Sequence, residues 1–308
     1  MDLSTLDEAV RLYCYRGLAE STHRTYRSGL SRYMSFCDAV NVSPPFPVSE
    51  TILCYFVTYL ARQGTSPASI KTYLAAVRHA QIVQGHPEPR QSSSLPRLRL
   101  VQNGIQRERA SSGTMLPIRL PVTISILRQV RPYCLASPPD HDSVMMWAAA
   151  TTCFFGFFRA GELTVPSVAA FDPAVHLAWG DVSVSDSRPH MIRVFLKRSK
   201  TDQFGRGVSI FLGPTGDDLC PVSAVLAYVA IRGNSPGAFF QSADGLPLTK
   251  AKFVARFRAV LVRAGVSTIG YSGHSFRIGA ATAASRAGIG WIPQIQNYLD
   301  EQSLVSGA

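Results

Sequence analysis

The sequence lacks a long apolar run and any closely paired cysteines. Its longest apolar stretch, residues 145–158, is shorter than the roughly 20 residues that a membrane-spanning helix needs, so no membrane partner is expected. The first residues show neither the basic nor the apolar region of a secretory signal. The six cysteines are scattered without a C-x-x-C pair, which predicts reduced, mostly buried thiols, an intracellular location and no metal site.

Lysine is also scarce, and arginine supplies most of the positive charge. Only five of the 31 basic residues are lysines, which leaves 26 arginines. Against 20 acidic residues this gives a formal net charge of +11, and the sequence pI is about 9.7. Residues 1–110 carry a net charge of +5 and the remainder +6, so both parts are basic. Because the arginine fork matches phosphate oxygens, this charge favours a nucleic-acid partner over a mere aid to solubility.

Length and composition predict two folded domains. The chain has 308 residues, about twice the usual domain length, and a hydrophobic content of 46% that excludes wholesale disorder. The first hundred residues are expected to form helices only, among them 22–40, 49–62 and one that starts at Pro67 with Ser66 as its N-cap. The expected organisation is a helical domain over residues 1–110, a linker over 111–115 and a second domain over 116–308.

The second domain is expected to be mostly helical with a small sheet. Three runs rich in Val, Ile and Phe predict a three-stranded antiparallel meander, over residues 176–184, 191–197 and 208–212. Helices are expected on both sides of this meander in the sequence, over residues 125–135, 143–158, 221–232, 249–264, 275–287 and 292–299. The predicted fold class is therefore α+β.

Three short fragments each place a cation at the edge of an ordered element. Arg159 is expected to end a long apolar helix, Lys200 to lie in the turn between the second and third strands, and His274 and Arg277 to share one helix face. Together these side chains could surround one phosphodiester. The arginines would neutralise nonbridging oxygens in the transition state, and the lysine would protonate a leaving 5′-oxygen.

Each fragment taken alone also has a structural explanation. Arg159 and Glu162 fit a helix-end ion pair, worth about 0.3–0.5 kcal/mol if it is exposed. Lys197, Arg198 and Lys200 fit a solvated hairpin tip, and an H-x-x-R sequence fits a helix cap. The order of an arginine, a strand-turn lysine and H-x-x-R behind a basic helical domain favours the phosphodiester site.

On these residues the chain resembles the tyrosine recombinases, or phage-integrase family, and especially the recombinases of eukaryotic mobile elements. The N-terminal helical part, including residues 66–74, resembles the core-binding domain of that family, and residues 116–290 resemble its catalytic domain. The fragment SGHSFRIGA at residues 272–280 is the most specific match, followed by RAGEL at 159–163 and SKTD at 199–202.

The resemblance implies a mechanism of DNA strand breakage and rejoining. A tyrosine attacks the scissile phosphate and forms a 3′-phosphotyrosyl intermediate, without a metal or other cofactor. By motif match, Arg159 and Arg277 would clamp the phosphate and Glu162 would support the site. Lys200 would be the general acid, with the lysine three residues earlier as second candidate, and His274 would assist proton transfer.

The sequence departs from the family after the H-x-x-R helix. No Gly-Arg-Trp or Gly-His segment follows, and Tyr298, the only tyrosine after Arg277, comes about three helical turns before the usual position of the nucleophile. We therefore expect Tyr298 to be a packing residue and the family's C-terminal tyrosine segment to be missing or replaced. The leading function is a tyrosine recombinase or integrase that is inactive as written. The alternatives are a non-catalytic DNA-binding protein that keeps the recombinase clamp and a type IB topoisomerase-like enzyme.

The expected partner is duplex DNA, held between the two domains. The protein is expected to form a homo-oligomer on DNA, or to be complemented by a full-length copy, and to be nuclear if its host is eukaryotic. The basic side chains expected to contact DNA are Arg24, Arg27, Lys71, Arg78, Arg97, Arg99 and Arg198.

Overall fold

The computed structural model describes residues 2–87, 95–112, 118–135, 138–199, 202 and 206–289. The chain divides into two compact units, Met1–Leu116 and Pro117–Ala308. No helix in the described ranges is long and apolar enough to cross a membrane. All six cysteines fall within these ranges, and five are buried while Cys14 is exposed, as the scattered pattern predicts.

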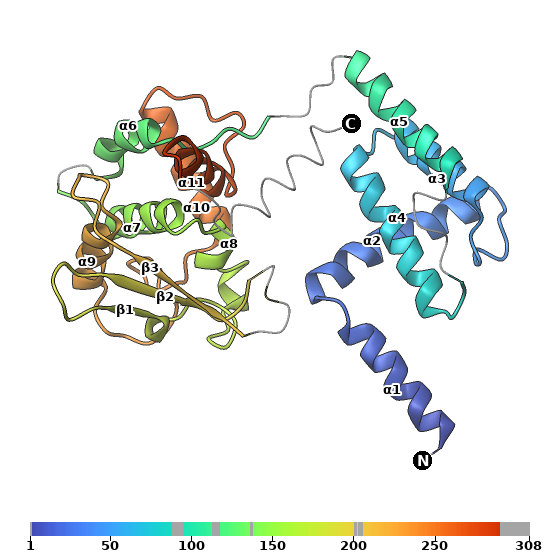
Figure 1. Ribbon diagram of the computed structural model, residues 1–308, viewed down its shortest axis with the longest axis horizontal. Helices are drawn as coiled ribbons and strands as arrows, with labels where there is room; N and C mark the ends of the chain where they lie inside the picture. The colour runs from blue at the N-terminus through green and yellow to red at the C-terminus, as the bar shows by residue number, and fades with distance from the viewer. Residues whose placement is uncertain are drawn as a thin grey trace. The chain divides into compact units, whose positions relative to one another are not determined.

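The first unit consists of helices in the part of the chain that the structure describes. These are α1 (Leu3–Arg16), α2 (Glu20–Ala39), α3 (Glu50–Arg62), α4 (Pro67–Val83) and α5 (Pro96–Ser111) (Figure 1). Helices α2 to α5 bury one apolar face each and share a core that includes Tyr33, Phe36, Phe56, Leu60 and Ile70. Because the apolar residues of each segment recur at helical spacing, each helix has one apolar face that packs against the others.

Side-chain caps fix where the helices of this unit begin. Helix α4 starts at Pro67 as expected, and the Ser66 hydroxyl accepts the amide N–H of Ser69 at 3.1 Å. Helix α5 has no such cap of its own. Instead, Glu50 in the first turn of α3 accepts the amide N–H groups of Arg97 and Leu98 at 2.9 and 3.1 Å. These bonds satisfy amides that the start of a helix leaves unpaired, and they join α5 to α3.

Helices α2 and α4 pack against each other at Gly29. A Cβ atom at Gly29 would lie 2.9 Å from the Cβ of Ala76 and 2.9 Å from Cδ1 of Tyr73, closer than real contacts allow. The glycine therefore permits the close approach of the two helices. Its cost is that glycine has a lower helix propensity than other residues would have at this position.

The second unit has six α-helices and one sheet within the described residues. The helices are α6 (Ile124–Cys134), α7 (His141–Phe155), α8 (Ala160–Leu163), α9 (Pro221–Arg232), α10 (Lys250–Arg263) and α11 (Ser275–Arg286), with short 3-10 turns η2 (Val168–Ala170) and η3 (Trp179–Asp181). Helix α7 is the centre of the unit: its residues from Met145 to Phe154 are all buried. In Figure 1 it lies between the sheet and helices α6 and α11, and it packs against both helices and α9.

The sheet is the three-stranded antiparallel meander that the sequence predicts. Its strands are β1 (Val182–Val184), β2 (Ile192–Leu196) and β3 (Val208–Leu212), in the order β1-β2-β3. Val182 pairs with Val194, and Ile192 pairs with Leu212. Alternate residues of β2 are buried in the core that contains α7, while Arg193 between them is exposed. This alternation is the period of two that a sheet covered on one face requires.

Two expected element boundaries were wrong. The strand expected over 176–184 begins only at Val182, because Asp181 accepts the amide N–H of Ala178 at 2.7 Å and closes the turn η3 before the strand. The helix expected over 143–158 ends at Phe155. The expected last helix over 292–299 lies outside the described residues.

Candidate active site

Arg159 does not end the long apolar helix, as the sequence analysis expected. Helix α7 stops first, because Phe157 adopts a left-handed conformation with φ of 55° and the amide N–H of Phe158 bonds to the carbonyl of Cys153 at 3.0 Å. This is the hydrogen-bonding pattern that commonly ends helices, usually with glycine at the left-handed position. Arg159 then precedes the short helix α8, for which it is the N-cap residue.

Glu162 holds Arg159 through two hydrogen bonds. The amide N–H of Arg159 donates to Oε2 of Glu162 at 2.8 Å, and its guanidinium Nη1 donates to Oε1 at 3.1 Å. The two side chains are only 18% and 11% exposed, so this ion pair is not a solvated surface pair. A carboxylate that binds both the backbone and the side chain of one arginine fixes the conformation of that arginine.

Arg277 reaches the same turn from a distant part of the sequence. It lies in the first turn of α11, is 9% exposed, and donates a hydrogen bond from Nη1 to the carbonyl of Phe157 at 3.0 Å. A second link joins the two segments, because the amide N–H of Ala160 bonds to the carbonyl of Gly273 at 3.4 Å. The structure therefore brings Arg159, Glu162 and Arg277 together.

Cys153 is buried next to this cluster, and the charges of Glu162 and Arg277 both affect the pKa of its thiol. Burial raises the pKa of the Cys153 thiol, the charge of Glu162 raises it further, and the charge of Arg277 opposes the rise. The thiol hydrogen-bonds to the carbonyl of Phe158 at 3.2 Å. Cys153 is thus a buried packing residue below the turn that bears Arg159.

His274 begins the helix that carries Arg277. It is the N-cap residue of α11 and partly buried, and its amide N–H donates to the Ser272 hydroxyl at 3.3 Å. The preceding Gly273 is packed so tightly against α8 that a Cβ there would lie 3.0 Å from the Cβ of Ala160. This contact holds the start of α11 beside the turn that bears Arg159, so His274 belongs to the same cluster of segments.

Two lysines were candidates for the general acid, and the structure describes one of them. Lys200 lies outside the described residues, as does Tyr298. Lys197, the second candidate, is bound to the carboxylate of Asp181 and to the carbonyl of His176, the latter at 3.3 Å. A lysine held in this way is bound to the turn before β1 and is not free to reach a phosphate. No group of three or more potential ligand side chains in the described ranges is placed to hold a metal ion.

The expected DNA-contacting cations are exposed on several elements. Arg24 and Arg27 lie on α2, Lys71 and Arg78 on the neighbouring α4, and Arg97 and Arg99 on α5; Arg198 follows β2 in the second unit. The basic helices α2 and α4 also carry aromatic rings and histidines, with the rings of Tyr26 and His79 5.5 Å apart. Burial and the nearby His23 lower the pKa of His79.

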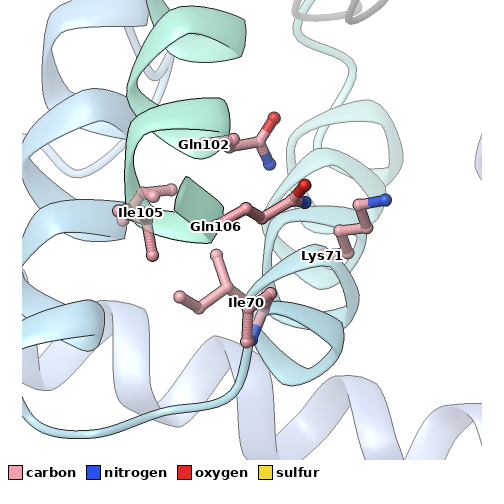
Figure 2. A pocket seen from close by; sticks show the side chains of 7 residues that line it. Ile70, Lys71, Gln102, Ile105 and Gln106 are labelled. Carbon is pink, nitrogen blue, oxygen red and sulfur yellow. The ribbon is translucent and has the colours of Figure 1, made fainter. Parts of the chain in front are cut away.

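A small pocket lies beside Lys71 in the first unit. It is formed where α4 meets α3 and α5, and Val57, Pro67, Ile70, Lys71, Gln102, Ile105 and Gln106 line it. Figure 2 shows the two glutamines, one helical turn apart on α5, together with Ile70 and Lys71 of α4. The sequence analysis did not select these glutamines, because nothing in the sequence shows that α5 faces α4 there.

The fold of the chain is that of integrases and site-specific recombinases. It matches a λ integrase dimer bound to a COC′ core site with a TM-score of 0.53 and 17% identity, over 92% of this chain and 70% of that one. It matches a λ integrase tetramer bound to a Holliday junction with a TM-score of 0.54 and 14% identity, over 93% and 74% of the two chains. It matches the XerH site-specific recombinase bound to a palindromic difH substrate with a TM-score of 0.54 and 13% identity, over 92% and 78%.

These likenesses confirm the α+β fold that the resemblance to tyrosine recombinases implies. The finer resemblance to recombinases of eukaryotic mobile elements stays a prediction. No protein-family model matches the sequence, and no curated protein matches it.

Proposed function

We propose that the protein binds duplex DNA and holds a backbone phosphate between Arg159 and Arg277, in a site of the tyrosine-recombinase type. The observation that carries this proposal is the hydrogen bond from Arg277 to the carbonyl of Phe157. It places Arg277 at the turn that Arg159 directly follows, although the two arginines are 118 positions apart in the sequence. These are the two arginines that the motifs select.

The chemistry of such a site follows from its charges. The arginines would donate hydrogen bonds to the nonbridging oxygens of the phosphate, and each charge-assisted bond contributes roughly 1.5–3 kcal/mol. Their role in strand cleavage is to stabilise the negative charge that builds up as a nucleophile adds to phosphorus. In that step a tyrosine hydroxyl loses its proton to a base and its oxygen bonds to phosphorus. The bond to the 5′-oxygen breaks, and a proton passes from an acid to that oxygen. The motif assigns the acid to Lys200, assisted by His274.

Binding is tested first, by fluorescence anisotropy with a labelled duplex over a series of salt concentrations. If about six phosphates are contacted, log K should fall against log salt with a slope near −5. Arg277→Gln should weaken binding, while Arg286→Gln, which removes an exposed charge from the last turn of the same helix, should have a much smaller effect. An affinity that does not change with salt would contradict the proposal.

Strand cleavage is tested separately, with a nicked suicide substrate that traps a covalent complex on a denaturing gel. We expect no covalent adduct from this chain alone. The two acidic residues that follow Tyr298 would repel both the scissile phosphate and a forming phenolate. An adduct that disappears in Tyr298→Phe would contradict this expectation and make Tyr298 the nucleophile.

Assembly on DNA is part of the same proposal. λ integrase has been solved as a dimer on a core site and as a tetramer on a Holliday junction. We expect this chain to form dimers or larger assemblies on duplex DNA, which sedimentation of the complex would show. An adduct that forms only when a tyrosine-containing full-length copy is added would support complementation between copies.

A further inference from the structure

Lys250, at the first position of α10, is held beside the candidate active site by its own backbone. Its amide N–H donates to the carbonyl of Val165 at 2.9 Å, and the amide N–H of Val165 donates to the carbonyl of Leu248 at 3.0 Å. The Thr249 hydroxyl caps the helix by accepting the amide N–H of Lys252 at 3.1 Å. The start of α10 is therefore fixed to the segment that directly follows α8.

The aliphatic stem of Lys250 crosses two glycines of the site. A Cβ at Gly273 would lie 3.4 Å from its Cε, and a Cβ at Gly161 would lie 4.0 Å from its Cδ. Gly161 lies between Arg159 and Glu162, and Gly273 directly precedes His274. Because neither position has a side chain, the stem of Lys250 can lie over the backbone of both segments. This packing keeps the end of the side chain next to the segments that carry Arg159 and His274.

The ammonium group of Lys250 is available to a ligand. The residue is exposed, and among the described residues its side chain has no hydrogen bond or ion pair. Lys252, two positions further along α10, differs in this respect: its ammonium donates to the Ser242 hydroxyl at 2.5 Å and lies 3.8 Å from a carboxylate oxygen of Asp142. The two lysines carry the same charge on the same helix, but only one of them is neutralised.

We propose that Lys250 binds a nonbridging oxygen of the DNA backbone at the candidate active site, next to the phosphate held by Arg159 and Arg277. This inference rests on the proposed function. A cation placed beside two arginines raises the repulsion among them in the absence of DNA, and a phosphate oxygen relieves that repulsion. The family motifs do not select this residue, and its position follows only from the packing of α10 against α8 and the start of α11.

The test compares Lys250→Gln with Lys252→Gln in the full chain, each bound to the same labelled duplex over 50 to 200 mM salt. Loss of one phosphate contact lowers the steepness of the log K against log salt plot by about 0.9. The ratio of wild-type to Lys250→Gln affinity should therefore shrink about 3.5-fold over this range. Lys252→Gln should keep the wild-type slope, because that lysine is already paired with Asp142. Circular dichroism checks that both variants are folded, which the exposure of Lys250 leads us to expect.

The possible outcomes separate this inference from the proposed function. A steep salt dependence in the wild type that is unchanged in Lys250→Gln would overturn the role of Lys250 and leave the proposed function in place. An equal loss of slope in both variants would also overturn it, because a general charge effect would then explain the result. A wild-type protein whose DNA affinity does not depend on salt would overturn the proposed function, and the assignment of Lys250 with it.

Discussion

Glu162 is the residue whose removal tests the architecture of the site most directly. It accepts two hydrogen bonds from Arg159, one from the backbone and one from the guanidinium, in surroundings that leave the two side chains 18% and 11% exposed. Hydrogen bonds to charged groups contribute about 1.5–3 kcal/mol each, and removing one partner of a buried pair costs about 3–5 kcal/mol. We expect Glu162→Ala to lower the free energy of unfolding of the second unit by about 3 kcal/mol.

The tryptophans make this change measurable in one unit of the chain. All three tryptophans fall within residues 117–308, so tryptophan emission reports unfolding of the second unit alone. For a unit of this size, a loss of about 3 kcal/mol corresponds to a fall of roughly 6–12 °C in the melting temperature. Urea titration followed by the same emission gives the free energy directly.

The matched control is the ion pair between Arg128 and Asp218 in the second unit, whose side chains are 56% and 48% exposed. Asp218→Ala should change the stability of that unit by less than about 0.5 kcal/mol, because an exposed pair is screened by water. If Glu162→Ala cost no more than Asp218→Ala, the pairing of Glu162 with Arg159 would not be the contact that fixes the site.

Three further predictions test the fold. Gly104→Ala on α5 should raise the stability of the first unit by about 0.5–1 kcal/mol in circular dichroism melts, because no atom lies near the added methyl group, whereas Gly29→Ala should lower it despite the same gain in helix propensity. Of the six thiols, only that of Cys14 should react rapidly with a thiol reagent in the native protein; fast reaction of a second thiol would contradict the described packing. Burial alone would raise the pKa of Asp142, but the Ala243 amide and the charges of Arg256 and Lys252 together lower it. The stability that this carboxylate contributes is therefore present above its unfolded pKa near 3.9 and lost as the pH falls through its folded pKa, so Asp142→Asn should flatten the acid limb of the stability curve.

The elements of the fold could be predicted because their signals are local. Apolar residues recur at helical spacing in α2 and α4, and a serine followed by proline marks the start of α4. The alternating burial of β2 likewise matches a run of Val, Ile and Phe in the sequence. Each of these signals lies within one element, so no knowledge of the tertiary structure is needed to read it.

The end of α7 could not be predicted for the opposite reason. The apolar run continues from Met145 through Phe158, across the point where the helix stops, because both the helix and the turn after it are buried. The turn uses Phe157 in a left-handed conformation, where sequence patterns lead one to expect glycine. Such a conformation in a non-glycine residue costs on the order of 1–3 kcal/mol, which the surrounding contacts must offset. Its carbonyl is the group that Arg277 binds.

The residues of the candidate site could be selected from sequence motifs, but their proximity in space could be seen only in the structure. The motifs selected Arg159, Glu162, His274 and Arg277, but nothing in the spacing shows that α11 packs against the turn after α7. Lys250 was not selected at all. Its place beside the site follows from two glycines on different segments, and a glycine that makes room for a lysine stem has no local signature in a sequence.

A site with several cations must also be stable before DNA arrives, and the contacts show how this is achieved. Glu162 neutralises Arg159, and the partial negative charge of the Phe157 carbonyl stabilises the guanidinium of Arg277. A carbonyl carries no net charge, so the hydrogen bond that it accepts leaves the guanidinium of Arg277 charged. In the proposed function, a phosphodiester would neutralise that charge. A carboxylate in place of the Phe157 carbonyl would stabilise the free protein further, but it would oppose the binding of the phosphate.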